Sequence, residues 1–166
     1  MFDECVSLKD KFSSDDVILE MDKGDPNDRV LYDMTNNIFR LLIVSEPFKE
    51  MLQKTDCGNV EFLPVLIKNQ REKIEKEKYY IVNLIDYIDK DKSTIDYDPM
   101  DESAIFSVEE INVINKNIPE NRDLFRAEYY PNRYIVSENL KNKIEDEEFE
   151  GIKFIPIEEF NSAIHK

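Results

Sequence analysis

The side chains best suited by type and spacing to metal chemistry are oxygen donors in an acidic stretch near the middle of the chain. Asp89, Asp91 and Ser93 match positions 1, 3 and 5 of an EF-hand calcium loop, which binds the ion through oxygen ligands. Such a loop needs glycine at position 6 and a bidentate glutamate at position 12, where this chain has Thr94 and Met100. The sharp turn is then unfavourable and the ligand cage incomplete, so we expect no metal site here.

Residues for nucleophilic catalysis are sparse. The single histidine, His165, lies beside the C-terminus, where chains are usually poorly ordered, and neither Cys5 nor Cys57 has a neighbouring CxxC partner. Three scattered glycines do not form a phosphate-binding loop. With 37 acidic residues, almost any fold brings two carboxylates together, so such a pair carries no specific signal. We therefore predict no catalytic residue, no metal and no cofactor, and not an enzyme.

The charge of the chain is strongly acidic. The 37 acidic residues face only 22 lysines and arginines, which gives a net charge of −15. Such a charge repels nucleic acid phosphates and anionic membranes, and it favours a basic protein partner. Acids gather between residues 86 and 110, where they far outnumber lysines. From this stretch we predict the partner-binding residues to be Asp89, Asp91, Asp96, Asp98, Asp101 and Glu102.

The chain has the length and composition of one domain, residues 1–166. Its N-terminal residues lack the basic and apolar regions of a secretory signal. The longest apolar run near the middle, residues 41–44, is too short to cross a bilayer. We expect a soluble cytoplasmic protein.

The elements that position these residues are indicated by an internal repeat. The letters IVSE occur at residues 43–46 and again at residues 135–138, and an ungapped alignment at this offset extends over 23 residues with seven identities. Apolar positions correspond as well, for example Phe48 with Leu140 and Leu52 with Ile144. We interpret the repeat as two related structural units, at about 41–66 and 133–158.

Each unit has the pattern of a strand, a capped helix, a turn and a second strand. The β-branched residues before each serine are typical of strands. Ser45 and Ser137 are placed to be N-caps, whose hydroxyls accept hydrogen bonds from the first turn of a helix. Strands are expected again at 60–65 and 152–157. The predicted fold class is α+β, with a mixed or mostly antiparallel sheet on which the two strand–helix–strand units pack.

The same segments resemble a bacterial family of small acidic immunity proteins, long carried as a domain of unknown function and found beside polymorphic toxins. The likeness covers roughly residues 41–157 and rests on VEFLPV, YYIVNLIDYID, IFR and IVSENLKNKIEDEEFEGIKFIPI. Its most specific parts are the V-S-E cap leading into a helix and the exit pattern at 151–157. The first copy departs from that exit pattern, with Asn59 where the second has Gly151.

The resemblance implies a non-enzymatic inhibitor that binds a cognate toxin and occludes it. An acidic inhibitor suits a basic, nuclease-type toxin acting in the cytoplasm, because its carboxylates take the place of phosphates. Two alternatives from other classes stay open. One is a metal-assisted small hydrolase or nucleotide-processing enzyme that uses carboxylates, and the other is a protein-interaction adaptor domain. The sequence predicts neither the toxin's chemistry nor the oligomeric state.

Overall fold

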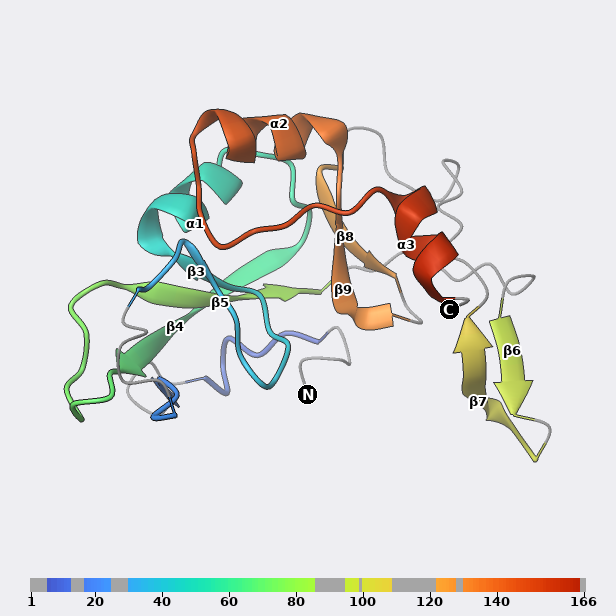
Figure 1. Ribbon diagram of the computed structural model, residues 1–166, viewed down its shortest axis with the longest axis horizontal. Coiled ribbons are helices and arrows are strands. Elements are labelled where there is room, and N and C mark those ends of the chain that lie inside the picture. The colour runs from blue at the N-terminus through green and yellow to red at the C-terminus, as the bar shows by residue number, and fades with distance from the viewer. Residues whose placement is uncertain are drawn as a thin grey trace.

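A computed structural model of the protein describes residues 6–12, 17–24, 30–85, 95–98, 100–108, 122–127 and 130–164, with the backbone alone described for 95–98, 101–108, 127, 130–133 and 161–164 (Figure 1). The elements, in chain order, are β1 (Ile18–Glu20), β2 (Met34–Thr35), β3 (Ile43–Ser45), α1 (Glu46–Leu52), β4 (Val60–Lys68), β5 (Tyr79–Leu84), β6 (Ile95–Asp98), β7 (Asp101–Val108), β8 (Leu124–Ala127), β9 (Tyr130–Val136), α2 (Glu138–Asp146) and α3 (Ile157–Ile164).

The largest sheet has five strands in the order β1-β4-β5-β3-β2. Strand β1 runs parallel to β4, with Ile18 opposite Leu66, whereas the other neighbouring pairs are antiparallel. The sheet is therefore mixed, and together with the helices it confirms the predicted α+β class. Strand β4 alternates buried and half-buried residues along its second half. Strand β5 is buried except at Tyr80, because it lies inside the sheet and both faces of the sheet are covered.

One face of the sheet is covered by α1 and α2, which lie above it in Figure 1. The side chains that meet there follow the period of two along each strand and the helical period of about 3.6. Burying them supplies the hydrophobic stabilisation of this layer. They include Val44, Val82 and Leu84 from the sheet, Phe48 and Leu52 from α1, and Leu140 and Ile144 from α2.

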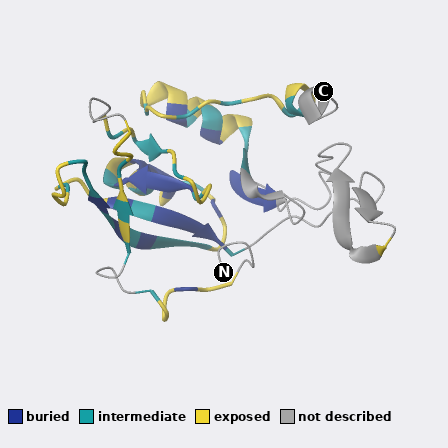
Figure 2. Cartoon of the chain, turned by 60° about the horizontal axis from the view of Figure 1, so that its bottom comes forward, coloured by how far each residue is buried: buried dark blue, intermediate teal, exposed yellow. Residues whose placement is uncertain are grey.

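The opposite face is covered by the N-terminal segment. Leu8, which is buried, packs on a cluster that includes Ile43, Ile81 and Val65. Figure 2 shows these central strands as the buried part of the chain, while the outer surface of α2 is largely exposed. The sheet thus carries a core on each side.

The remaining strands form two small sheets of two strands each. Strands β6 and β7 make an antiparallel hairpin that stands apart from the five-stranded sheet in Figure 1. Strands β8 and β9 form the second pair, and β9 leads through Ser137 into α2. In both places the residues IVS lead from a strand into a helix, at β3–α1 and at β9–α2.

The exit of the second unit differs from the prediction. Residues 60–65 form the first part of β4, as expected, and pair with β5. Residues 152–156, by contrast, form no strand, and α3 begins at Ile157. A strand needs a neighbour whose backbone completes its hydrogen bonds. Residues 60–65 have that neighbour, whereas no ladder includes residues 152–156 among the described pairings.

Candidate functional site

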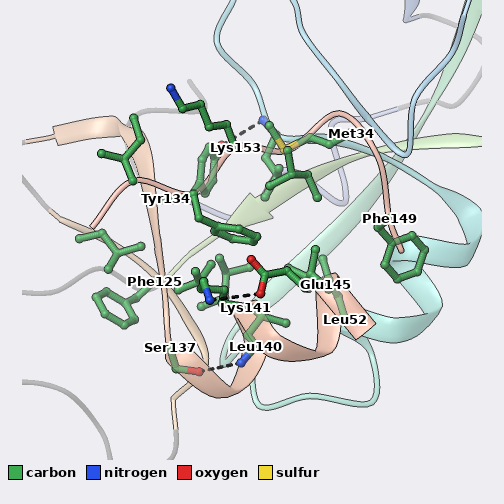
Figure 3. A pocket seen from close by; sticks show the side chains of 18 of the residues that line it. Met34, Leu52, Phe125, Tyr134, Ser137, Leu140, Lys141, Glu145, Phe149 and Lys153 are labelled. Carbon is green, nitrogen blue, oxygen red and sulfur yellow. Dashed lines mark hydrogen bonds and ion pairs between the residues drawn. The ribbon is translucent and has the colours of Figure 1, made fainter. Parts of the chain in front are cut away.

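Both predicted capping serines begin a helix. The Ser45 hydroxyl accepts a hydrogen bond from the Phe48 amide at 3.4 Å, and the Ser137 hydroxyl accepts one from the Leu140 amide at 3.0 Å. Each serine has extended backbone angles, as an N-cap requires. Figure 3 shows the second of these bonds. These serines therefore have a structural role at the starts of the two helices.

Each serine is in turn held by an aspartate that the sequence did not single out. The Ser45 hydroxyl donates to Asp33 at 2.7 Å, and the Ser137 hydroxyl donates to Asp123 at 2.5 Å. The serine amides also donate to the carbonyls of the same two aspartates, at 2.8 and 2.9 Å. Asp123 is buried and also accepts from the Asn139 amide group. At both helix starts, therefore, the serine hydroxyl donates to the aspartate carboxylate and the serine amide donates to the aspartate carbonyl.

The two units also contact one another in a reciprocal way. The Met34 amide, beside the first unit, donates to the carbonyl of Glu150 in the second at 3.0 Å. The Asp123 amide, beside the second unit, donates to the carbonyl of Asp56 in the first at 2.7 Å. In each case a residue beside one unit donates to a carbonyl shortly after the helix of the other unit. This exchange supports our proposal that residues 41–66 and 133–158 are related units.

Glycine is required where each unit leaves its helix. Gly58 and Gly151 have φ angles of +68° and +87°, which favour a residue without a Cβ. A Cβ at Gly58 would overlap the Arg122 guanidinium, and a Cβ at Gly151 would overlap the Met34 carbonyl. Both glycines therefore permit the close approach between the units.

A cleft of about 1210 Å³ lies between the loop after β2, strand β9, helix α2 and residues 152–160 (Figure 3). Its surface is mainly apolar, and several of its side chains also belong to the hydrophobic core. The Tyr134 hydroxyl accepts a hydrogen bond from the Leu42 amide at 3.2 Å and so links the two walls. The apolar lining includes Leu42, Phe48, Tyr134, Leu140, Phe149 and Phe154.

Three charged side chains of the cleft form ion pairs with one another. Lys141 lies 3.1 Å from Glu145 and 3.5 Å from Glu138, and all three line the cleft. The hydrogen bond that Lys141 donates to Glu145, together with the nearby carboxylates, raises the pKa of Lys141, so its amine stays protonated near neutral pH. Within the part of the chain that the structure describes, no cluster of three or more His, Cys, Asp or Glu residues is arranged to hold a metal ion.

Four of the six predicted acidic residues lie in the β6–β7 hairpin. Asp96 and Asp98 are on β6, and Asp101 and Glu102 are on β7, with Asp98 opposite Asp101 in the register. The backbone thus brings Asp98, Asp101 and Glu102 together at the turn end of the hairpin, whereas Asp96 is opposite Ser107, nearer the open end. The other two, Asp89 and Asp91, lie outside the described residues.

Of the residues considered for catalysis, only Cys57 is described by the structure. Cys57 is buried and free, and burial raises the pKa of its thiol, which disfavours the reactive thiolate. Cys5 and His165 lie outside the described residues. None of the described helices is long and apolar enough to span a membrane.

Fold and surface together define an acidic α+β protein with an apolar cleft and a charged hairpin, features suited to binding another protein. The sequence match agrees with this class. The chain belongs to an immunity protein family (Imm11), whose model matches residues 10–159. A search among curated proteins found no match.

Proposed function

We propose that this immunity protein binds one cognate protein toxin and neutralises it by covering a functional surface of the toxin, without chemical turnover. The family match over residues 10–159 carries the proposal. The net charge of −15 supports a basic toxin domain, of which nucleases are the clearest example, because a nucleic acid substrate demands positive charge. Protection of this kind is needed where the toxin acts, which we place in the cytoplasm.

The β6–β7 hairpin is the proposed acidic contact. Its backbone places Asp98 opposite Asp101, with Asp96 and Glu102 on the same two strands. These four acidic residues concentrate negative charge on two short strands. A basic partner is attracted to such charge over a distance of about a Debye length, roughly 8–10 Å at physiological salt. We extend the proposed contact to Asp89 and Asp91, which precede β6 in the sequence.

Growth of a bacterial host tests the proposed function. We take the protein encoded by the neighbouring gene as the candidate toxin. Its C-terminal domain is produced in the cytoplasm, alone or together with this protein. We expect the toxin domain alone to arrest growth and the pair to restore it. A Leu140→Asp variant is the negative control, because Leu140 is fully buried and a charge there disrupts the core. Continued arrest beside soluble, folded wild-type protein would contradict the proposal.

A further inference from the structure

The loop between β2 and β3, a blue-to-cyan hairpin in Figure 1, is braced by hydrogen bonds to one residue, Asn37. The Asn37 carboxamide oxygen accepts hydrogen bonds from the amides of Phe39 and Leu41, each at 3.1 Å. The nitrogen of the same group donates to the Leu41 carbonyl at 2.8 Å, and the Arg40 amide donates to the Asn37 carbonyl at 3.1 Å. Four bonds from one residue therefore fix the tip of the loop.

At this fixed tip two large apolar side chains are exposed to water. Ile38 is 89% exposed and Phe39 is 62% exposed. We call this pair the apolar knuckle. Single exposed apolar residues are common, but two adjacent ones on a rigid loop offer a contact that a partner can bury without ordering the loop first.

The backbone beside the knuckle is strained. Arg40 has a φ of +55°, in the left-handed region that non-glycine residues adopt at a cost. The Asn37 bonds hold the neighbouring residues and so maintain this conformation. Such strain is found most often where a loop has a task beyond packing. The exposed Arg40 adds a residue type that, like aromatic residues, is enriched in protein interfaces.

The knuckle adjoins the cleft without filling it. Asn36, Asn37 and Arg40 line the cleft, whereas Ile38 and Phe39 lie outside its lining. A protein seated on the knuckle can therefore extend over the cleft opening. A second copy of this chain is a poor occupant, because it would bring another charge of −15 against the first. A basic protein domain is the occupant that the charge favours.

We infer that the apolar knuckle is the short-range anchor for the cognate toxin, with Ile38 and Phe39 entering an apolar depression on a basic toxin domain. The inference rests on the proposed function and adds to it a second contact of a different kind. Apolar anchors are buried only after docking, so they act on dissociation, whereas the acidic hairpin acts on encounter. The two contacts are therefore separable by kinetics.

Binding kinetics of the purified toxin domain from the neighbouring gene test this inference. The variants are Ile38→Ser and Phe39→Ser, and the matched control is Ile74→Ser, a residue 45% exposed on the connection between β4 and β5. We expect each knuckle variant to dissociate about tenfold to a hundredfold faster, with an unchanged association rate and melting temperature. The control should bind as the wild type does.

Each outcome decides a different statement. Wild-type binding with unchanged dissociation of both knuckle variants would overturn the anchor while leaving the proposed function intact. Absence of wild-type binding to the toxin domain would overturn the proposed function, and the anchor with it. Sedimentation of the free protein measures whether it forms a dimer. If the wild type is a dimer and the Phe39→Ser variant is a monomer, the knuckle serves self-association and the anchor is overturned.

Discussion

At the scale of single residues, the helix starts depend on a hydroxyl that is used twice. Ser137 accepts a hydrogen bond from the Leu140 amide and donates one to the buried carboxylate of Asp123. Ser45 does the same with Phe48 and Asp33. A hydroxyl can donate and accept at once, which a backbone amide cannot, so serine both caps the helix and ties it to the preceding strand.

The capping serines could be predicted from the sequence, but their aspartate partners could not. Glutamate directly after each serine and apolar residues at helical spacing indicate a helix start. Asp33 lies 12 residues before Ser45, whereas Asp123 lies 14 residues before Ser137. An ungapped comparison of the two copies cannot align them. Allowing hairpins of different length would have revealed the shared aspartate.

Glu61 is the residue that fixes the N-terminal segment to the sheet. Its carboxylate accepts from the Ser7 hydroxyl at 2.5 Å, from the Leu8 amide at 2.9 Å and from the Asn83 amide group at 3.0 Å. Burial alone raises the pKa of Glu61, but these hydrogen bonds outweigh it and hold the pKa below its usual value. The charged form is therefore the one that stabilises the folded protein.

The lowered pKa of Glu61 predicts how the stability of the folded protein depends on pH. A carboxyl whose pKa is lowered by folding stabilises above its unfolded value, about 4.3, and loses that contribution as pH falls through the folded value. We expect Glu61→Gln to lower the free energy of unfolding by about 1 kcal/mol at pH 7. The deficit should shrink below about pH 4. Denaturant unfolding at both pH values measures it, with the exposed Glu50→Gln as control. An equal deficit at both pH values would exclude the charge as its cause.

At the scale of elements, the β6–β7 hairpin is a separate unit of charge. It forms its own two-stranded sheet, and Met100 in its turn is 94% exposed. Because neither strand of the hairpin belongs to the five-stranded sheet, we expect changes of charge on the hairpin to leave the main core intact. Binding and stability can thus be tested separately there.

Charge reversal on the hairpin is expected to slow association more than it changes stability. The variant combines Asp96→Lys, Asp98→Lys and Asp101→Lys, and we expect association with the toxin domain to slow about tenfold at low salt, with dissociation nearly unchanged. The control reverses Asp146, Glu147 and Glu148 at the exposed end of α2, which changes the net charge equally. Stopped-flow kinetics at two salt concentrations measure both. Equal slowing by the two variants would mean that net charge matters, and not the hairpin.

Elements that depend on local residue types could be predicted from the sequence, whereas elements that depend on pairing with a distant strand could not. The strand–helix junctions at β3–α1 and β9–α2 follow from local residue types, because caps and β-branched residues act within a few positions. The exit segment at 152–156 has the same local pattern as β4 but forms no strand. Strand formation depends on a distant neighbour, and an isolated pattern does not reveal one.

At the scale of the whole molecule, the resemblance over residues 41–157 indicated the class of protein before any site was known, and the acidic composition only favoured a basic protein partner. A net charge of −15 argues against nucleic acid as a partner, and the family match assigns the chain to immunity proteins. The cleft and the apolar knuckle could not be predicted. The cleft combines residues from four separate parts of the chain, and exposure of Ile38 and Phe39 depends on how the loop is braced.

The stoichiometry of neutralisation tests the central claim most directly. A fixed amount of the purified toxin domain is titrated with this protein, and the remaining toxin activity is measured. An occluding inhibitor predicts a linear loss of activity that is complete at about one molecule per toxin domain, provided that the concentrations far exceed Kd. Complete inactivation by a small fraction of one equivalent would contradict occlusion and indicate an enzyme. Full activity at a large excess would contradict neutralisation itself.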